Sequence, residues 1–569
     1  MSVTQRDQTG ANGVSDGGAG RRYRALPGPA APWAVPFTLV LGILLVRNAW
    51  LFSVPVYEDA DLGAYSIQVE QARRFTLLVG NYSREKFNHP GPAFLYVQSW
   101  GEDLFYAALR AVPAAWNGQV LALYLLTAFF AASVVAAGWH WGGHRGGLAT
   151  LGVLGLYGAL HPSVFSSPWM PYVYAPAYLA LLVSVASVAA GRTRDAWLAA
   201  LSGWFLIHGH ACFLLFVPLL WLSAVASPLA PRVRRRARER VAGRASAATP
   251  DHQRNHPRTR LRPSPGRRAW LPVAAISAVF ALPLAIELAL HWPGNFGKYF
   301  AYSGSSQSGG HSIAQVAAYA LWFWWPHAGA WAVAAALALA AVAAAWRMPP
   351  GPVRRFCQAL LAADALSTVA FIAYAATGID ALNQYYIGYF YWSAPVLAIL
   401  VLALAATQFA STGRPAPASA SAASAVTAVI VAATLAACAA FAVASSARLS
   451  TAHADPANPT GTGPVSDPNL PAGVAHIARL AAGRYVVLTI AQHNAWPAVT
   501  GLLVEAERTS VHACVVGQNW QFMMTSQFIC TPKEIAAGRH FLVWMPGGVP
   551  RNMPVVFRLR RGIVTNGPK

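Results

Sequence analysis

The chain has 569 residues, of which 56% are hydrophobic and only 11% are charged, and its mean hydropathy is +0.39. Soluble domains carry about 25% charged residues, so this composition excludes an ordinary soluble enzyme. Many apolar stretches reach about 20 residues, the length that crosses a bilayer. The sequence therefore predicts a polytopic α-helical membrane protein.

The net charge of +22 would point to a nucleic-acid partner if the basic residues formed a patch on a folded domain. Instead, thirteen arginines fall between Arg232 and Arg268, against only two acids. A segment so poor in apolar residues is expected to be disordered, and the positive-inside rule puts it in the cytoplasm. We therefore expect no nucleic-acid partner. The preference for arginine over lysine is typical of a GC-rich bacterial genome.

Residues 1–30 are rich in Gly, Ser and Arg and are expected to form a disordered cytoplasmic N-terminus. The apolar segment Pro32–Pro55 is too long for a signal-peptide core and lacks a small-residue cleavage site, so it is predicted to be a membrane helix. Further membrane helices are predicted at 118–138, 147–165, 173–190, 270–290, 314–346, 356–376, 393–411 and 422–446. The stretch His89–Arg110 carries Glu102 and Asp103 in its middle and is predicted to lie at the membrane interface.

The region 196–226 is interpreted through the charges that flank it. The basic segment 191–195 and the loop 232–268 should both be cytoplasmic, which requires an even number of crossings in 31 residues. Two helices there would each be shorter than the hydrocarbon core, so their turn near His208 and His210 would lie inside protein or beside a watery cavity. The alternative is one long tilted helix. With the hairpin, about 11 crossings are expected, with the N-terminus inside and the C-terminus outside.

The composition changes after Ser446, where residues 447–470 read as a Pro/Ala/Gly/Thr-rich linker. Strand-like runs follow at 485–490, 511–516, 520–525, 541–545 and 554–559, with a helix predicted over Trp496–Arg508. Residues 471–569 are therefore predicted to form a small extracytoplasmic α/β domain. We interpret it as a recognition or scaffold module for an acceptor glycan, because it shows no catalytic or metal-binding pattern and Glu505 and Glu507 look like exposed helix charges.

Two cysteines, Cys514 and Cys530, fall in this C-terminal domain. An oxidising compartment favours a disulfide between them, and the alternative is a pair of buried thiols.

The predicted first extracytoplasmic loop, residues 55–117, is unusually acidic. It holds seven of the 20 acidic residues of the chain, namely Glu58, Asp59, Asp61, Glu70, Glu85, Glu102 and Asp103. Neighbouring carboxylates raise one another's proton affinity unless a cation relieves them. Such a cluster suits a general base, or a divalent-metal site in which Asp59 and Asp61 would be the ligands. The alternative is a solvated, negatively charged loop end.

The same loop then carries basic residues beside an apolar, aromatic run. Arg84, Lys86 and His89 precede a Pro-Gly-Pro turn, and Phe94–Tyr96 follows it. Arginine and lysine bind phosphate, and aromatic residues lie at the headgroup level of a bilayer. The pattern indicates a site for a lipid phosphate, although basic residues also snorkel at bilayer edges without binding a ligand.

The order of a membrane helix, an acidic loop and a His-Pro-Gly-Pro-aromatic turn resembles the GT-C superfamily of integral membrane glycosyltransferases. Actinobacterial relatives of the aminoarabinose and protein mannosyltransferases are the most similar, and the resemblance covers mainly residues 34–110. It implies transfer of a sugar from a polyprenyl-phosphate donor to a cell-envelope glycan, lipid or exported protein. The reaction would occur on the outer face of the bacterial plasma membrane.

The resemblance also implies roles for particular residues. Asp59 and Asp61 match the catalytic acidic position of the family, and the sequence leaves open which of them is the base. This base would deprotonate the acceptor hydroxyl for an attack that inverts the anomeric centre. Arg84, His89 and Lys86 would hold the leaving phosphate. The full set of candidate substrate-binding residues is Glu58, Tyr82, Arg84, Lys86, Asn88, His89 and His210.

Two other functions fit parts of the pattern. A transporter or flippase of lipid-linked intermediates would concentrate acids in mid-helix positions and show internal repeats. Here the acids concentrate in an outer loop and no repeat is detected, which favours the transferase. A non-catalytic scaffold of GT-C type also stays open, because Glu58 departs from the simplest acidic pattern of the family.

Overall fold

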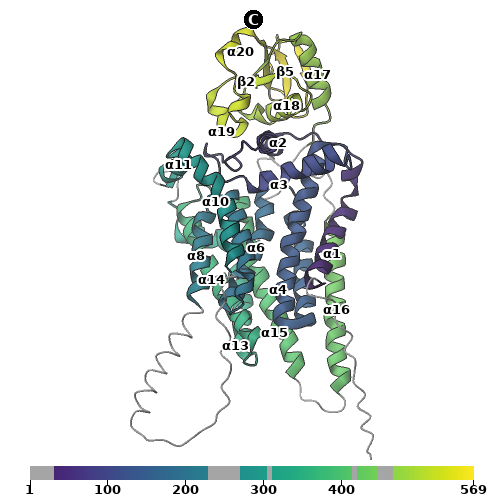
Figure 1. Cartoon of the computed structure of the whole chain (residues 1–569), viewed down its shortest axis with the longest axis vertical. Coiled ribbons are helices and arrows are strands. Elements are labelled where there is room, and N and C mark those ends of the chain that lie inside the picture. The colour runs from purple at the N-terminus through teal and green to yellow at the C-terminus, as the bar shows by residue number, and fades with distance from the viewer. Residues whose placement is uncertain (1–30, 228–269, 304–309, 413–418, 446–465, 569) are drawn as a thin grey trace, which may run out of the picture.

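The computed structural model describes residues 31–227, 270–303, 310–412, 419–445 and 466–568. The predicted cytoplasmic segments 1–30 and 232–268, and nearly all of the predicted linker, lie outside these described residues. A bundle of long helices forms the larger part of the molecule, and a small domain with a β-sheet lies on one end of it (Figure 1).

The bundle begins with α1 (Ala31–Arg47), which is shorter than the predicted membrane helix Pro32–Pro55. The helix ends because Asn48 turns its side chain back onto the bundle, where its Nδ2 donates to the carbonyl oxygens of Leu44 (2.8 Å) and Ser445 (3.0 Å). A short 3₁₀ helix, η1 (Ala49–Phe52), follows. The prediction was therefore too long at its C-terminal end.

The next long element, α4 (Ala115–Leu160), is two helices joined at Gly143, whose φ of 64° is not helical. A Cβ atom built on Gly138 would lie 2.0 Å from Oγ1 of Thr150. Residues twelve apart in a straight helix would be about 18 Å apart along its axis, so the chain reverses at Gly143. The two halves correspond to the predicted helices 118–138 and 147–165.

The region 196–226 forms the predicted hairpin rather than one tilted helix. Its two helices are α7 (Ala196–Gly209) and α8 (Phe213–Ala226), each of 14 residues. At 1.5 Å per residue each spans about 21 Å, less than the hydrocarbon core of about 30 Å. His210 between them has an extended backbone and lies against protein. The turn thus avoids lipid, as non-helical backbone must.

The other helices of the bundle largely follow the hydropathy pattern. They are α5 (Ser163–Ser166), α6 (Met170–Ala189), η3 (Thr193–Asp195), α10 (Leu271–His291), α11 (Gly294–Ser303), α12 (Ile313–Trp322), α13 (Ala330–Arg347), α14 (Pro352–Thr377), η5 (Tyr385–Trp392), α15 (Ser393–Thr412) and α16 (Ser419–Ala444). The prediction of a single helix over 314–346 was wrong. Two helices form there, because the chain turns at 323–329, where Gly329 begins α13 with a φ of 81°.

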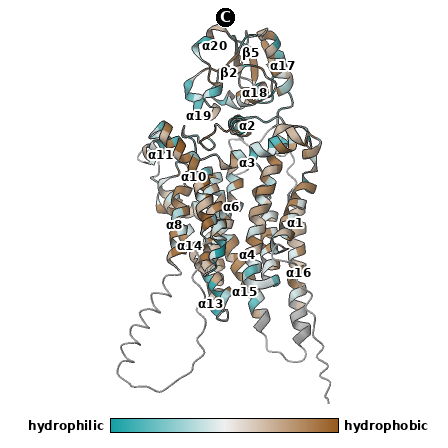
Figure 2. Ribbon diagram, viewed as in Figure 1, coloured by the Kyte–Doolittle hydropathy of each residue, from teal (hydrophilic) through white to brown (hydrophobic). Residues whose placement is uncertain are grey.

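Seven of the described helices are long and apolar enough to cross a membrane, and α4 with its reversal is one of them. Shorter apolar helices, α1, α8 and α12, accompany them. Brown, hydrophobic ribbon dominates the bundle, whereas the domain at its end is mixed (Figure 2). Helices α10, α13 and α16 bury little of their apolar surface, as expected for helices that face lipid. The prediction of a polytopic helical membrane protein is confirmed.

The acidic outer loop is largely helical. It forms α2 (Ala60–Arg73), α3 (Ala93–Gly101) and a π-helical turn, η2 (Glu102–Ala108). Both α2 and α3 lie at the end of the bundle below the C-terminal domain (Figure 1). One face of α2, with Leu62 and Val69, packs on the bundle, and the opposite face, with Ala64 and Ile67, belongs to the core of the C-terminal domain. The helix α2 therefore joins the two parts of the protein.

The C-terminal domain is the predicted small α/β unit. Its helices are α17 (Leu470–Ala481), η7 (His493–Ala495), α18 (Trp496–Arg508), η8 (Gln518–Trp520), α19 (Gln521–Met524), η9 (Ser526–Phe528) and α20 (Pro532–Ala537). Its strands are β1 (Val486–Ile490), β2 (Ala513–Val515), β3 (Arg539–Trp544), β4 (Val555–Arg558) and β5 (Ile563–Asn566). The sheet has the order β2-β1-β3-β5-β4, with β1 parallel to β2 and β3, and β5 antiparallel to β3 and β4.

Three features of this domain differ from the sequence prediction. The run 520–525 forms α19 rather than a strand, because its buried residues Trp520, Met523 and Met524 recur at helical spacing. The short strand β5 was missed. The charges of α18 were also misread, since Glu505 is buried and Glu507 pairs with Arg74.

Candidate functional site

A cavity of about 750 Å³ lies between the helical bundle and the C-terminal domain. Three parts of the chain line it. The outer loop contributes Asp61, Tyr65, Asn81, Tyr82, Ser83, Arg84, Glu85, Lys86, Phe87 and His89. The bundle contributes residues of α6, α8, α11, α14 and η5 together with His210, and the C-terminal domain contributes His493, Trp496, Asn519, Trp520, Phe522 and Met523.

Besides Glu85 and Asp380, the acidic side chain that lines the cavity is Asp61. The hydroxyl of Tyr82 donates a hydrogen bond to its Oδ1, and the indole Nε1 of Trp169 donates to its Oδ2 at 2.8 Å. Burial raises the pKa of Asp61 above its usual value, although both hydrogen bonds act in the opposite direction. A carboxylate with a raised pKa, held by two donors, is suited to accept a proton from a bound hydroxyl group.

The backbone that presents Asp61 is strained. Ala60, which begins α2, has a φ of 52°, a conformation that a residue with a Cβ rarely adopts. Helix α18 of the C-terminal domain supports this turn, since Oγ1 of Thr500 donates to the carbonyl oxygen of Ala60 at 3.2 Å. The two helices α2 and α18 are in close contact here, because a Cβ atom on Gly63 would lie 2.9 Å from Oγ1 of Thr500. Such local strain persists only where the surroundings determine it.

A second part of the lining is basic. Arg84 forms ion pairs with Asp380 and with Glu85 (3.3 Å), and Lys86 lines the cavity two residues further on. The short loop that carries them is held by a hydrogen bond from Lys86 N to the carbonyl oxygen of Ser83 (3.1 Å). Two cations and two carboxylates thus meet at this side of the cavity, and a bound anion would compete with the carboxylates for Arg84.

Two histidines from different elements meet beside this basic side. The rings of His89 and His210 have centroids 4.2 Å apart, and Nδ1 of His89 accepts a hydrogen bond from the backbone N–H of Ala211 (3.3 Å). Burial, with the neighbouring His210, lowers the pKa of His89 well below its usual value. His89 is therefore neutral, and its Nε2–H is the group that can donate to a ligand. His208 does not line the cavity; its ring nitrogens bond to the backbone of Ala93 and Phe280.

Three predicted site residues do not line the cavity. Asp59 is buried, its Oδ2 lies 3.8 Å from Nε of Arg561, and burial raises its pKa to about 7. Glu58 accepts a hydrogen bond from Ser66 and forms an ion pair with the C-terminal domain. Asn88 donates through Nδ2 to the carbonyl oxygen of Phe522 at 2.8 Å. Glu58 and Asn88 thus bond to protein partners around the cavity, whereas both carboxylate oxygens of Asp59 are buried without a hydrogen-bond partner among the described residues.

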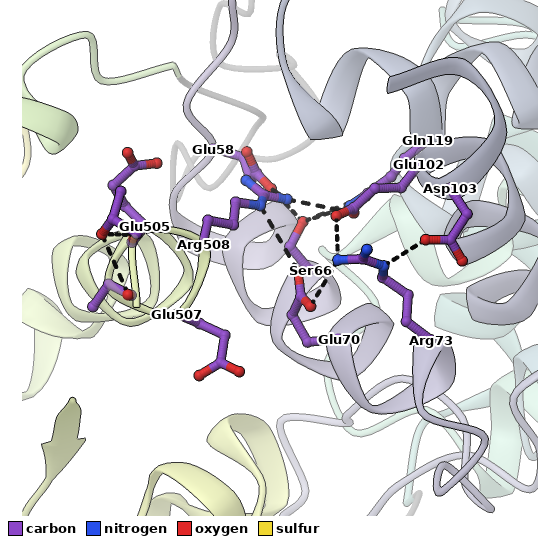
Figure 3. A network of polar contacts seen from close by, with 12 residues as sticks. Glu58, Ser66, Glu70, Arg73, Glu102, Asp103, Gln119, Glu505, Glu507 and Arg508 are labelled. Atoms are coloured by element: carbon purple, nitrogen blue, oxygen red, sulfur yellow. Dashed lines mark hydrogen bonds and ion pairs between the residues drawn. The ribbon is translucent and has the colours of Figure 1, made fainter. Parts of the chain in front are cut away.

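Most of the acidic residues of the outer loop form a polar network away from the cavity (Figure 3). Arg508 of α18 lies 2.8 Å from Glu58, 3.7 Å from Glu102 and 3.8 Å from Glu70. Arg73 of α2 pairs with Glu70, Glu102 and Asp103 at 3.1, 3.0 and 2.8 Å. The clustering of acids in the sequence thus reflects this interdomain network, and of the seven acids only Asp61 and Glu85 line the cavity.

A metal site at Asp59 and Asp61 finds no support in the geometry of the described residues. Asp61 is directed to Tyr82 and Trp169, and Asp59 is close to Arg561. Within the described ranges, no group of three or more His, Cys, Asp and Glu side chains converges in a way that could hold a metal ion.

The sequence did not indicate several residues of the site. Trp169 lies in the turn before α6, and the residues from the C-terminal domain lie about 430 positions after Asp61. Helix α11 also contributes, since Tyr299 donates to the carbonyl oxygen of Asn88 and Tyr302 lines the cavity. The sequence offers one signal at these positions, an aromatic residue at the predicted outer membrane boundary.

A polytopic helical bundle with a small C-terminal α/β domain is the fold class that the sequence predicts, and the structure has both parts. Among solved structures the chain is similar to ArnT from Cupriavidus metallidurans in the apo state. The TM-score is 0.52 at 14% identity, over 95% of this chain and all of that one. The chain therefore shares the fold of ArnT. No protein-family model matches the sequence, and no curated protein matches it significantly.

Proposed function

We propose that this protein is a membrane glycosyltransferase that moves a sugar from a polyprenyl-phosphate donor to an acceptor of the cell envelope. The observation that carries the proposal is Asp61, whose carboxylate lines a large cavity between Tyr82 and Trp169 with basic residues on another side. A general base beside an anion-binding group is what displacement of a phosphate by a hydroxyl requires. The GT-C fold supports the same class of reaction.

In the proposed reaction, Asp61 accepts the proton of an acceptor hydroxyl as its oxygen attacks the anomeric carbon of the donor sugar. The bond between that carbon and the phosphate oxygen breaks, and the polyprenyl phosphate leaves with the electron pair. Direct displacement of this kind inverts the anomeric centre. Tyr82 and Trp169 orient the carboxylate, so that its geometry is fixed before the substrate arrives.

The leaving phosphate is assigned to the basic side. Arg84 and Lys86 supply positive charge there, and neutral His89 supplies an N–H donor. Charge-assisted hydrogen bonds of this kind stabilise the negative charge that develops on the leaving oxygen. The apolar wall of the bundle, with Phe213 and Phe390, then accommodates the first isoprene units of the lipid.

The proposal includes an orientation in the plasma membrane. The N-terminus and the arginine-rich segment 232–268 lie in the cytoplasm by the positive-inside rule. The outer loop, the cavity and the C-terminal domain lie on the opposite side, where a polyprenyl-linked sugar is accessible. Oxidising conditions there also suit the disulfide between Cys514 and Cys530.

The test compares two neighbouring isosteric variants. Asp61→Asn should reduce transfer of radiolabelled sugar from membrane polyprenyl phosphate by at least about 100-fold, the usual contribution of a general base. Asp59→Asn should reduce it far less, because Asp59 does not line the cavity. Transfer at the wild-type rate by folded Asp61→Asn protein would contradict the proposal and would favour a non-catalytic scaffold or a transporter.

A further inference from the structure

The C-terminal domain supplies a wall of the cavity that the proposed chemistry does not use. Six of its residues line the cavity, namely His493, Trp496, Asn519, Trp520, Phe522 and Met523. They come from η7, from the start of α18 and from the segment of η8 and α19. We call these six residues the outer wall. All six belong to the C-terminal domain, which lies on the end of the bundle (Figure 1).

The outer wall is a fixed part of the molecule. A disulfide joins Cys514 to Cys530 and closes the segment that carries Asn519, Trp520, Phe522 and Met523. Below this segment, Met524 and Phe528 are buried in the core of the domain. Its edge is tied to the outer loop by the hydrogen bond from Asn88 Nδ2 to the carbonyl oxygen of Phe522, 2.8 Å long. The wall therefore keeps its position relative to the loop that carries Asp61.

Only one aromatic ring separates the outer wall from Asp61. The hydroxyl of Tyr82 donates to Asp61. The centroid of the Tyr82 ring lies 6.4 Å from the ring centroid of Trp496 and 6.0 Å from that of Phe522. A molecule whose hydroxyl group contacts Asp61 can therefore reach these two rings with the rest of its body.

The chemistry of the outer wall differs from that of the bundle side. The ring of His493 stacks on Trp520 with centroids 5.2 Å apart, and the imidazole of His493 and the amide of Asn519 are exposed. Aromatic faces with a few polar groups between them suit a ligand that is apolar on its face and polar at its edge. A sugar ring has this character, whereas a prenyl chain matches the bundle side, where Met170, Phe213 and Phe390 lie.

We propose that the outer wall is the acceptor subsite and that the acceptor is a carbohydrate chain. Its terminal sugar stacks on Trp496 and Phe522, with its hydroxyl groups bonded to Asn519 and His493. The inference rests on the proposed function, and it selects a glycan among the acceptors that this function allows. The C-terminal domain is then part of the active site rather than a separate module.

The experiment uses two variants of exposed polar wall residues, each with a neighbouring control. Asn519→Ala is matched by Gln518→Ala, and His493→Ala by Asn494→Ala, because the two control residues are exposed and do not line the cavity. The acceptor is envelope glycan extracted from a strain that lacks this protein, and the donor is the labelled polyprenyl-phosphate sugar of its membranes. Asn519→Ala and His493→Ala should each raise KM for the glycan about tenfold, the effect of one lost polar contact. KM for the donor should not change in either variant, and KM for the glycan should not change in the two controls.

A binding measurement separates the two halves of the cavity without catalysis. Polyprenyl phosphate alone should bind to the wall variants as it binds to the wild type, and more weakly to Lys86→Gln on the basic side. Weakened binding to the wall variants, or an unchanged KM for the glycan, would overturn the acceptor subsite. Transfer to envelope protein with none to glycan would do the same. Wild-type protein that transfers no more sugar than Asp61→Asn would instead refute the proposed function.

Discussion

Nη2 of Arg508 lies 2.8 Å from Oε1 of Glu58, and this ion pair joins the last turn of α18 to the residues just before α2. The two residues are 450 positions apart in the chain, and both are largely removed from solvent. Burial lowers the pKa of Arg508, but the carboxylates of Glu58 and Glu102 outweigh burial, so the guanidinium stays charged. Glu58 lies three residues before Asp61 in the chain, so the ion pair couples the C-terminal domain to the proposed catalytic base.

The first prediction concerns Arg508→Met. Removal of this guanidinium leaves the buried carboxylates of Glu58 and Glu102 without their nearest interdomain cation, and breaking such a buried pair costs about 3–5 kcal/mol. The thermal unfolding midpoint of the purified protein should fall clearly. Arg479→Met, at an exposed position of α17, should leave the midpoint almost unchanged.

A partner substitution tests the cause of that loss. Addition of Glu58→Gln to Arg508→Met removes one of the uncompensated charges and should recover part of the stability. If the double variant is as unstable as the sum of the two single variants, the ion pair is not the source of the effect.

The second prediction concerns Thr500→Val, which replaces a buried hydroxyl by a methyl group of similar size. It removes the hydroxyl that contacts the carbonyl oxygens of Ala60 (3.2 Å) and Pro497 (2.8 Å), and the backbone at Ala60 positions Asp61. We expect a lower kcat, by about fivefold to tenfold for one hydrogen bond, with little change in KM for the donor. Thr509→Val, at the other end of the same helix, is the control, because Thr509 bonds only within its own region. An equal loss of kcat in both variants would contradict a positioning role for Thr500.

The third prediction concerns pH. Burial, with a contribution from Glu102, raises the pKa of Glu70 to about 7, and burial raises the pKa values of Asp59 and Glu505 to about 7 as well. Unfolded Asp and Glu titrate near pH 4, so between about pH 4.5 and 7 the folded protein holds protons that the unfolded chain has released. Stability should therefore fall as pH rises through this window, by about 1.4 kcal/mol per pH unit for each group at most, and level off above it.

Thermal unfolding midpoints of the detergent-solubilised protein, measured between pH 5 and 8, test whether stability falls as pH rises. Glu70→Gln should flatten the decline, because one titrating group is removed. A midpoint that rises from pH 5 to pH 7 would show that the carboxylates at this junction are ionised throughout and fully compensated by Arg73 and Arg508.

The fourth prediction concerns the disulfide. Replacement of Cys514 and Cys530 by Ser opens a loop of 16 residues, for which the chain-entropy model gives a loss of about 3 kcal/mol. Because this loop carries most of the outer wall, KM for the glycan acceptor should rise together with the loss of stability. Cys438→Ser, at a free cysteine of α16, is the control and should leave KM unchanged. If the double serine variant keeps the wild-type KM, the wall does not depend on the disulfide.

Much of the fold follows from local patterns in the sequence. Apolar length predicts the membrane helices, and the charges on either side of 196–226 predict the α7–α8 hairpin. The helix Trp496–Arg508 forms within the limits that its composition indicates. Errors occur where local patterns are ambiguous: the run 520–525, which contains α19, resembles a strand when its six residues are taken alone, and the turn between α12 and α13 is itself apolar.

The candidate site was predictable only in part. The sequence drew attention to residues 58–103 because charge is scarce elsewhere, and Asp61, Tyr82, Arg84, Lys86, His89 and His210 do line one cavity. It could not separate Asp61 from its neighbours Glu58 and Asp59. That separation depends on the turn at Ala60 and on partners such as Trp169 and Arg508, which are distant in the chain.

The sequence by itself determined that this protein is a membrane-embedded helical bundle with an acidic loop after its first helix and a small α/β domain. Hydrophobicity and charge are properties of short segments, so they are legible without contacts. Only the tertiary structure decided that α2 is buried on two faces, that Glu58 stabilises the junction while Asp61 lines the cavity, and that the C-terminal domain forms one of the cavity walls. The reason is physical: the role of a carboxylate depends on whether an arginine, a tyrosine or open space lies beside it, and folding alone brings these partners together.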